Sequence, residues 1–337
     1  MAETIRIFTL NVWSGFRYNG LIRLEEYEQP ETRETRFTGL LREIERLRPD
    51  LLALGELNPL FDRTHQVESA TRYDSFVHMG VAGVRAGKFG FPLNLREGDG
   101  IFAAPDLHAE WVGRAHLGGS GYCGNIFSFH FDNLTQALLV RLRTRGGKEL
   151  YFCGTHFTAA PDDCADNRRI LEEYAAQMHC GRRKMFKAGR KLSNGAAMRM
   201  TESGRLLEFL RRNVPADAPL IVAGDLNAET GWMEIQALLD AGFTDLSPTS
   251  PEGKMTWDPR FNRNLSTFYA EDAQREYLSP YKKLEATDEL TPRNIDHILV
   301  RNLPQQPDGC CTICADQPYE GLNLSDHFGL FAELKIE

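Results

Sequence analysis

The sequence lacks several features that would place it in a membrane-spanning or exported class. No run of about 18 or more apolar residues occurs, which excludes a transmembrane helix. The opening residues, MAETIRIFTLNVW, contain no basic region followed by an apolar stretch. No internal repeat or low-complexity tract appears. We therefore expect a cytoplasmic protein that contacts membranes only peripherally.

Excess positive charge is also absent. Lys and Arg number 39 against 47 Asp and Glu, which gives a formal net charge of −8. Proteins that bind duplex nucleic acid usually carry a basic balance, because phosphate neutralisation supplies much of their affinity. The composition counts against a nucleic-acid partner without excluding one. With 42% hydrophobic residues in 337, the chain has enough apolar material for one large α/β domain, residues 1–337, or for two smaller ones.

The cysteines give no sign of a disulfide framework or a zinc site. Their number, seven, is odd and fits a reducing compartment. Cys310, Cys311 and Cys314 lie close together, but a zinc site needs about four ligands, and no matching Cys or His pair follows at a suitable spacing. We expect these three residues to pack in a strand.

What the sequence does contain is a series of apolar strands alternating with amphipathic helices. Residues 33–49 place apolar side chains on one helical face and stop at Pro49. Gly242 is a suitable stop for another helix. Further helices are expected at 167–178, 202–214 and 231–242, and strands at 5–13, 50–58, 100–113, 136–144, 149–157, 220–227, 295–302 and 328–336.

This order predicts the fold class. Strand pairs and strand-helix-strand units occur in both halves, which favours a four-layer α/β sandwich of two packed mixed β-sheets flanked by helices. Loops at strand ends commonly carry function. Polar residues at the strand ends should therefore gather at one edge and form an active site.

The candidate site residues share one property, which is that each closes a mostly apolar run. The stretch LIVAGDLNAE, residues 220–229, is an example, although a GD pair alone commonly makes an ordinary turn. Comparable endings occur in TLNVW, LLALGELN, YFCGTHF, NIDHILV and LNLSDHFGLF. Turn chemistry does not explain so many. The residues are Asn11, Glu56, His156, Asp225, Asn227, Asp296, Asp326 and His327.

In this order the motifs LNVW, GEL, GTHF, GDLN, IDHIL and LSDH resemble those of the endonuclease/exonuclease/phosphatase superfamily, from Asn11 to His327. Within it the chain is most similar to the neutral magnesium-dependent sphingomyelinases. Trp13 and the histidine of GTHF carry that similarity, together with TWDPRFNRNL, which resembles a stretch of the bacterial enzymes. The glycine-lysine-alanine segment of the animal enzymes has no clear counterpart, and GYCGNIFSFHFDN occupies its place.

The resemblance implies a Mg²⁺-dependent hydrolysis, with Mn²⁺ as a possible substitute. Phosphodiester cleavage requires a hard cation, a base and hydrogen-bond donors around the phosphorus. Glu56 is the expected principal ligand, assisted by Asn11 and Asp326, because Mg²⁺ prefers one or two carboxylates completed by water and phosphate oxygens.

The remaining roles also follow from the resemblance. His327 is the expected general base, with Asp296 fixing its tautomer. His156 and Asn227 should donate to phosphate oxygens, with Asn11 also contacting the substrate, while Asp225 orients or deprotonates the water or assists the leaving group. Which of Asp225 and His327 activates water stays open. Gly224 should allow the backbone to approach the phosphate closely.

Other histidines and glycines receive structural interpretations. His297 follows Asp296 on a strand and should point to the opposite face. Residues 80–100 are rich in glycine, but GVRAGKF is one residue short of a phosphate-binding loop and lacks its Ser or Thr. We expect a mobile surface loop there.

A basic insert at about 179–200 separates two expected helices. No acidic residue occurs from Tyr174 to Thr201. The insert is either a solvated loop or an electrostatic contact for an anionic membrane, with Met185 and Phe186 as apolar contacts; a nucleic-acid strand would also satisfy its charge. Its basic residues are Arg182, Arg183, Lys184, Lys187, Arg190, Lys191 and Arg199.

The expected function is therefore a phosphodiesterase that acts on sphingomyelin or a related phospholipid at a membrane surface. The alternative is a nuclease or a phosphomonoesterase of the phosphoinositide type, from the same superfamily. A catalytically silent binding module is disfavoured by the complete set of polar residues. Specificity is expected to lie in residues 80–100, 117–134 and 257–290.

Overall fold

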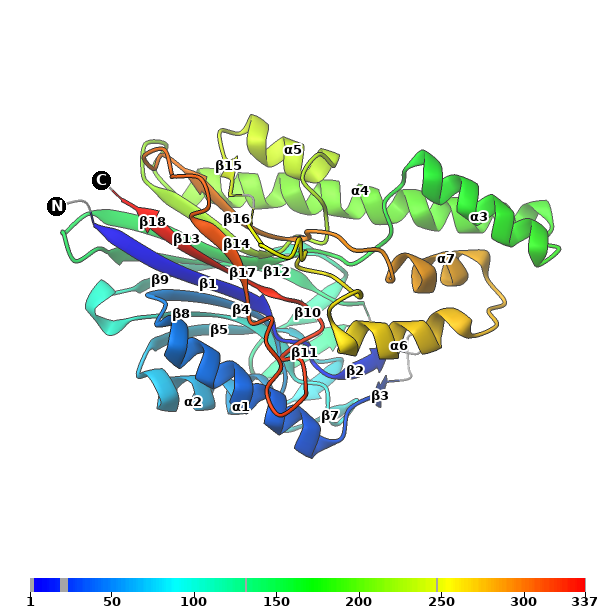
Figure 1. Cartoon of the computed structure of the whole chain (residues 1–337), viewed down its shortest axis with the longest axis horizontal. Helices are drawn as coiled ribbons and strands as arrows, with labels where there is room; N and C mark the ends of the chain where they lie inside the picture. Colours follow the sequence, from blue (N-terminus) through cyan, green and yellow to red (C-terminus); the bar gives the residue numbers. More distant parts are fainter. Residues whose placement is uncertain (1–2, 19–23, 131, 247, 337) are drawn as a thin grey trace.

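The computed structural model describes residues 3–18, 24–130, 132–246 and 248–336, and two six-stranded mixed sheets pack face to face in it (Figure 1). The first sheet has the order β17 (Cys311–Cys314), β18 (Gly329–Lys335), β1 (Thr4–Asn11), β4 (Leu51–Leu57), β8 (Glu97–Ala103) and β5 (Asp74–Val81). The second has the order β15 (Thr244–Asp245), β16 (Asp296–Arg301), β14 (Leu220–Asp225), β13 (Glu149–His156), β12 (Thr135–Arg143) and β9 (Glu110–Gly118).

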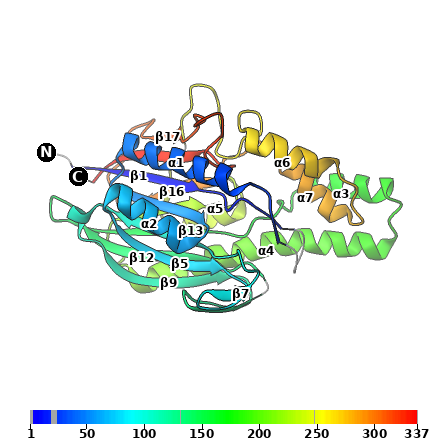
Figure 2. The same cartoon turned by 90° about the horizontal axis from the view of Figure 1, so that it is seen from below.

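Helices cover the outer face of each sheet, which confirms the predicted four-layer sandwich. Helices α1 (Pro30–Leu47) and α2 (Leu60–Thr71) lie on the first sheet, and α4 (Arg182–Asn213) and α5 (Met233–Asp240) on the second. Figure 2 shows α3 (Ala165–Gln177), α6 (Arg263–Gln274), α7 (Pro280–Asp288) and the first part of α4 extending beyond the sheets. No helix in the described ranges is both long and apolar enough to cross a bilayer.

The apolar strands are buried on both faces, which explains their unbroken hydrophobic runs. Ile5 and Ile7 of β1 pack between the two sheets, whereas Phe8 and Leu10 of the same strand face α1. On the other sheet, Val222 of β14 packs towards α4 and α5. Because both faces are covered, only the strand ends can carry polar groups to the surface.

The prediction for residues 100–113 was wrong in one respect. They do not form one strand: β8 ends at Ala103, a short 3₁₀ turn covers Pro105–Leu107, and β9 begins at Glu110 in the other sheet. Pro105 cannot donate a ladder hydrogen bond. The segment therefore crosses from one sheet to the other.

Residues 80–100 form regular structure and not the expected loop. Strands β6 (Val84–Ala86) and β7 (Phe89–Phe91) form a hairpin that joins β11 (Phe127–His130) and β10 (Gly121–Cys123) in a four-stranded sheet, which we call the small sheet. Its order is β10-β11-β6-β7. A further short hairpin pairs β2 (Phe16–Tyr18) with β3 (Leu24–Glu26).

The basic insert is helical, so the solvated loop, one of the two interpretations left open, is wrong. Residues 182–213 form the single helix α4, and the helix expected at 202–214 is its second part. The first part continues the buried stripe through Ala188, Leu192 and Gly195. Arg199 lies fully buried, 3.0 Å from Glu234, and is unavailable to a membrane.

Candidate active site

The strand register places three predicted site residues side by side at one edge of the second sheet. His156 closes β13, Asp225 closes β14, and Asp296 opens β16; Asp225 pairs with His156 on one side and with Asp296 on the other. Because β16 runs antiparallel to β14, its first residue lies beside the last residues of β13 and β14. His156 Nε2 lies 3.5 Å from Asp225 Oδ2.

The first sheet contributes Asn11 and Glu56 from neighbouring parallel strands. Asn11 pairs with Gly55, and Glu56 follows in a bulge, where two residues of β4 oppose Asp99 of β8. Glu56 has φ 56°, in the left-handed region. A bulge redirects the side chain that it carries. Here both oxygens of Glu56 face the N-terminal segment, accepting from Asn11 Nδ2 and from the Ser14 amide at 3.0 Å each.

Asn11 connects the two sheets. Its Nδ2 also donates to Asp225 Oδ2 at 3.1 Å, while its Oδ1 accepts the Trp13 amide at 3.0 Å. The side-chain amide nitrogen of Asn11 therefore donates to two carboxylates, and its oxygen accepts a hydrogen bond from the backbone. In this geometry Asn11 positions Glu56 and Asp225, and its predicted role as a metal ligand stays a prediction.

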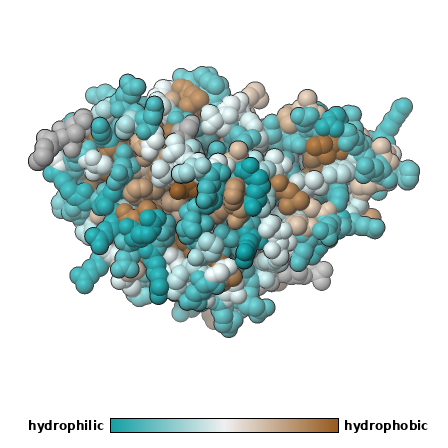
Figure 3. All heavy atoms as spheres, viewed as in Figure 1, coloured by the Kyte–Doolittle hydropathy of each residue, from teal (hydrophilic) through white to brown (hydrophobic). Residues whose placement is uncertain are grey.

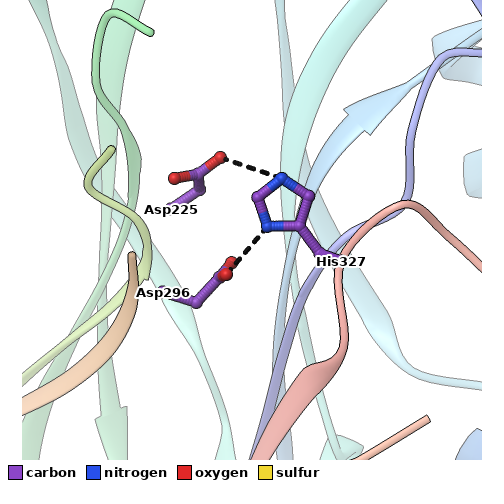
Figure 4. Close-up of side chains that lie close together, drawn as sticks. All are labelled: Asp225, Asp296 and His327. Atoms are coloured by element: carbon purple, nitrogen blue, oxygen red, sulfur yellow. Dashed lines mark hydrogen bonds and ion pairs between the residues drawn. The ribbon is translucent and has the colours of Figure 1, made fainter. Parts of the chain in front are cut away.

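His327 lies between two carboxylates, as Figure 4 shows. Its Nδ1 is 2.8 Å from Asp296 Oδ2, and its Nε2 is 3.6 Å from Asp225 Oδ2. Burial acts to lower the pKa of His327, but the carboxylates of Asp296 and Asp225 raise it well above the ordinary value. The predicted pair of His327 and Asp296 thus has the geometry of an acid-base dyad, and its catalytic role stays a prediction.

These three residues offer ligand atoms within 4.8 Å of one another, but they do not suit a single cation. Figure 4 shows the two carboxylates on the same side of the imidazole ring, each facing a different ring nitrogen. A metal between His327 and Asp296 would replace the bond that fixes the tautomer. The cluster is better described as a chain of proton-transfer groups.

Glu56 and Asp326 fit a divalent cation better. Both line the same cleft. Burial raises the pKa of Asp326 to about 7, and the nearby carboxylate of Glu56 contributes to the shift. Two neighbouring carboxylates, whose charge His327 and Arg36 offset only in part, are what a bound cation neutralises. Carboxylate oxygens are also the ligands that Mg²⁺ prefers.

His156 is surrounded by negative charge. Burial acts to lower its pKa, but the carboxylates of Asp225, Asp99 and Glu56 raise it to about 9. Asp99 Oδ1 lies 3.9 Å from His156 Nδ1, and its Oδ2 accepts from Gln136 Nε2 at 2.8 Å. His156 is therefore cationic at neutral pH and suited to donate to a phosphate oxygen. The sequence reasoning missed Asp99.

Gly224, at the end of β14, has a different role from the predicted one. Gly224 has φ 146°, and a Cβ there would lie 1.9 Å from the Thr155 carbonyl oxygen. The glycine is thus required by the neighbouring strand β13, and not by an approaching phosphate. Asn227, with φ 48°, donates its amide N–H to Asp225 Oδ1 at 2.9 Å and its Nδ2 to the Phe157 carbonyl at 3.0 Å. It orients Asp225.

The stretch TWDPRFNRNL supports the site from behind. Thr256 Oγ1 accepts the Asp296 amide at 3.2 Å, and the Trp257 ring packs edge-on against His327 with centroids 4.9 Å apart. Asn262 Nδ2 donates to the Ser325 and Asp326 carbonyls, at 3.0 Å each. These residues hold the two segments that carry the dyad and Asp326.

Ser325 and Arg36 are further supports that the sequence reasoning missed. Ser325 Oγ lies 2.6 Å from the Asn11 carbonyl and 3.1 Å from Asp326 Oδ1. Arg36 is buried on α1, pairs with Glu28 and donates to the Leu324 carbonyl at 2.6 Å. The polar residues at 323 and 325–327, interrupted only by Leu324, were the available sequence signal.

Several negative expectations can be checked. His297 points away from the site, with Nδ1 3.0 Å from Asp245 and Nε2 2.8 Å from the Ala228 carbonyl, which confirms its structural role. Cys311 and Cys314 pack in the cores on the two faces of β17, as expected. All seven cysteines are free thiols. The hairpin of β6 and β7 confirms that residues 83–89 are not a phosphate-binding loop.

The site opens into a cleft of about 1030 Å³. Glu56, His156 and Asp326 line one end. The small sheet and α4 line the rest, through Val84 and Phe91 on one side and Met198 on the other. The cleft therefore combines the polar residues of the site with apolar walls, and further polar side chains such as Asp132, Thr201 and Arg205 also line it.

Comparison with known proteins identifies the family. The model of the endonuclease/exonuclease/phosphatase family matches residues 8–327. No curated protein sequence matches the chain.

Among solved structures, an endonuclease/exonuclease/phosphatase from Bacteroides vulgatus is similar at 17% identity and a TM-score of 0.58, covering 99% of this chain and 100% of its own. TDP2 of D. rerio, complexed with a single-strand DNA product, is 15% identical with a TM-score of 0.57 and 98% coverage of both chains. TDP2 from Caenorhabditis elegans is 14% identical, with a TM-score of 0.52 and coverage of 99% of this chain and 74% of its own. The chain belongs to the endonuclease/exonuclease/phosphatase family and is a metal-dependent phosphoric ester hydrolase.

Proposed function

We propose that this protein is a Mg²⁺-dependent phosphodiesterase that removes the headgroup of a phospholipid, with sphingomyelin as the first candidate substrate. The observation that carries the proposal is the two-part cleft. Its polar end holds Glu56, His156 and Asp326, and its walls include Trp13, Phe16, Val81, Val84, Phe91, Leu95, Leu117 and Met198. A phosphodiester attached to an apolar group matches both parts.

The charge of the cleft favours an amphiphile over a nucleic acid. The lining residues include the cations Arg205 and Lys282, whereas the acidic ones are Glu56, Glu97, Asp99, Asp132 and Asp326. Arg205 is also engaged, because its Nη1 donates to the Leu117 carbonyl at 2.5 Å. A strand of nucleic acid carries a negative charge at every phosphate and is normally bound in a basic groove. Beyond one phosphate, this cleft offers little to such a polymer.

The residues divide the chemistry between them. Glu56 and Asp326 would hold Mg²⁺, which when bound offsets negative charge on the phosphate and lowers the pKa of a bound water. His327, in the form that is deprotonated at Nε2, takes the proton of the attacking water there, while Asp296 keeps the other proton on Nδ1; because Asp296 and Asp225 raise the pKa of His327, turnover should increase as pH rises through that raised value. Asp225, held by Asn11 and Asn227, orients the water beside Nε2. His156 donates to a phosphate oxygen.

A nuclease is the second candidate. The structure of D. rerio TDP2 with a single-strand DNA product is the observation that favours it. At 15% identity the similarity shows a shared fold, so the substrate must be decided by measurement.

The deciding experiment is a panel of substrates with Mg²⁺, with Mn²⁺ and with a chelator. It contains sphingomyelin, lysophospholipids, phosphoinositides, and single- and double-stranded DNA. We expect the phosphodiester phospholipids to be cleaved fastest, and the Glu56→Gln variant to be inactive on all of them. Release of nucleotides at a rate above that of every lipid would replace the proposal with the nuclease.

A further inference from the structure

The small sheet has one face made almost entirely of exposed apolar side chains. Residues paired across strands point to the same side of a sheet. The pairing puts Tyr122, Phe129, Val84 and Phe91 in one row across the four strands, and Phe127, Ala86 and Phe89 in the next. We call this the apolar face.

The apolar face is exposed to solvent. Phe89 is 84% exposed, and Leu93 and Ile126, in the turns beside it, are 77% and 76% exposed. Val84, Phe91, Tyr122, Phe127 and Phe129 are also among the exposed large hydrophobic residues. Contiguous apolar patches of this kind usually mark an interaction surface. By contrast, the side of the molecule in Figure 3 is mostly hydrophilic, with hydrophobic residues in small separate groups.

The opposite side of the small sheet is polar and buried, so the exposed face is a built feature. Arg85 is buried there and donates to the Pro92 and Leu95 carbonyls at 3.0 and 2.7 Å. His130 Nε2 accepts the amides of Ala82 and Gly83 at 2.8 and 3.0 Å. Turning the aromatic residues inward would turn Arg85 and His130 outward and break these bonds. The bonds therefore favour the orientation in which the apolar side faces solvent.

The apolar face is continuous with the active-site cleft. Val84 and Phe91 belong to both, and Pro92 and Leu95 extend the cleft wall from the same hairpin. In Figure 2 the small sheet, marked by β7, lies at the lower edge of the molecule, on the side of the sandwich away from α1. Whatever covers this face would therefore sit at the mouth of the cleft.

The chemistry of the face favours a lipid bilayer over a protein. Lys88, in the β6–β7 turn, is the only exposed charged residue in segments 83–93 and 119–130. Tyr is enriched at membrane interfaces, and Phe and Leu commonly form the apolar face of helices that lie in the interface. A protein partner is expected to need a polar rim with hydrogen bonds around an apolar centre. A bilayer requires no such polar rim.

We propose that the apolar face of the small sheet inserts into the interfacial layer of a phospholipid bilayer and brings the mouth of the cleft to the headgroups. The choice of a bilayer as the occupant rests on the proposed function, because a phospholipid substrate leaves its acyl chains in the membrane. The binding itself does not require turnover. It therefore has a test that is independent of catalysis.

The test compares two variants that each lose four exposed apolar side chains. The face variant carries Phe89→Ser, Leu93→Ser, Ile126→Ser and Phe127→Ser, none of which lines the cleft. The matched control carries Phe61→Ser, Phe186→Ser, Met233→Ser and Leu278→Ser, which are exposed on other elements. Sedimentation with phosphatidylcholine vesicles in chelator measures binding. Hydrolysis of a soluble chromogenic phosphodiester with Mg²⁺ reports on the site.

We expect the face variant to bind vesicles at least about tenfold more weakly than wild type, since each side chain contributes through the apolar area that it buries. The control variant should bind like wild type, and both should hydrolyse the soluble substrate normally. Vesicle binding unchanged in the face variant would overturn the inference. The inference would also be overturned if the wild type were a dimer that did not bind vesicles and the face variant were a monomer. The face would then join two copies of this chain.

A second measurement covers the case in which the face variant does not fold. Phe89→Trp preserves an aromatic side chain, and its fluorescence should be quenched by brominated phosphatidylcholine beyond the quenching of wild type. Met233→Trp, on α5, is the control and should show no added quenching. Equal quenching in both would contradict the inference. Vesicle binding that survives while no phospholipid is cleaved would reject the proposed substrate and leave the membrane contact standing.

Discussion

The two parts of the cleft are built in different ways. The polar end consists of buried side chains that the register of two sheets brings together, such as Asp225 between His156 and Asp296. The small sheet, which contributes Val84 and Phe91 to the cleft, consists of short strands whose outer side chains are exposed. Changes at the polar end should therefore alter chemistry by large factors. Changes on the small sheet should alter where the enzyme works and leave the chemistry intact.

The largest effect is expected from Glu56→Gln, which removes a carboxylate from the proposed cation site. We expect a loss of turnover of about 10³-fold or more, because stabilising charge on a transferring phosphoryl group is usually the largest single contribution. Calorimetric titration should show Mg²⁺ binding in wild type and none in the variant. Glu110→Gln, at a fully exposed position on β9, is the control. Unchanged Mg²⁺ affinity would remove Glu56 from the site.

The next largest effect is expected from Asp296→Asn, which loses the charge at His327 Nδ1, 2.8 Å away. We expect kcat to fall by about 10²- to 10⁴-fold, the usual contribution of general acid-base catalysis. Asp245→Asn is the matched control, because Asp245 forms a similar pair with His297 on the other face of the second sheet. Equal losses of activity in the two variants would show that His327 does not depend on its partner.

A smaller effect is expected from Asn262→Ala. Its side chain bonds to the Ser325 and Asp326 carbonyls and contacts no reacting group. Supports of this kind commonly change metal affinity or activity by about 10- to 100-fold. The loss should appear mainly as weaker Mg²⁺ activation and should be partly recovered at high Mg²⁺. If the variant lost the same fraction of activity at every Mg²⁺ concentration, Asn262 would not act through Asp326.

The Asp245 and His297 pair should affect stability and its dependence on pH. Both nitrogens of His297 face acceptors, so the ring is held as a cation. Burial acts to lower the pKa of His297, but the bond to Asp245 raises it. Burial acts to raise the pKa of Asp245, but the bond to His297 lowers it.

The sign of the pH dependence follows from these directions. The raised pKa of His297 contributes stability that is fully present below about pH 6.5 and is lost as pH rises through the folded-state value. The lowered pKa of Asp245 contributes stability that is lost on acidification below about pH 4. Asp245→Asn should therefore cost about 1–3 kcal/mol near pH 5–6 and less at pH 9. Urea unfolding at both pH values measures this, and an equal cost at both would contradict the cationic pair.

Sequence patterns predicted the parts of the molecule in which both faces of a strand are buried. The run LIVAGD has no polar residue until its end, so its polar residues had to lie at the sheet edge. The eight predicted site residues accordingly lie in one connected region. The resemblance supplied their roles, which strand periodicity alone could not.

The rest of the structure depends on contacts between distant segments. The strands of the small sheet are three or four residues long, too short for a periodic signal, and they contain glycine at Gly90 and Gly121. Asn262 acts on Asp326 across 64 positions, which no local pattern reveals. The first part of α4 was missed because its charges and glycines suggested a loop, although Met185, Ala188 and Leu192 already have helical spacing.

The smallest effect on vesicle binding at physiological salt is expected from the basic residues at the start of α4. Removing them tests whether charge or apolar contact is the main source of membrane binding. Arg182, Arg183, Lys184 and Lys187 are exposed there. Replacing them with Gln should weaken binding to anionic vesicles at low salt, by up to about 1 kcal/mol per residue. Binding to phosphatidylcholine vesicles should not change, because those vesicles carry no net charge. Exposed charges are screened beyond about 10 Å at 0.1 M salt, so the difference on anionic vesicles should shrink as salt is added, whereas the loss in the face variant should persist. If the Gln variant also lost binding to neutral vesicles, the basic helix and not the apolar face would be the principal membrane contact.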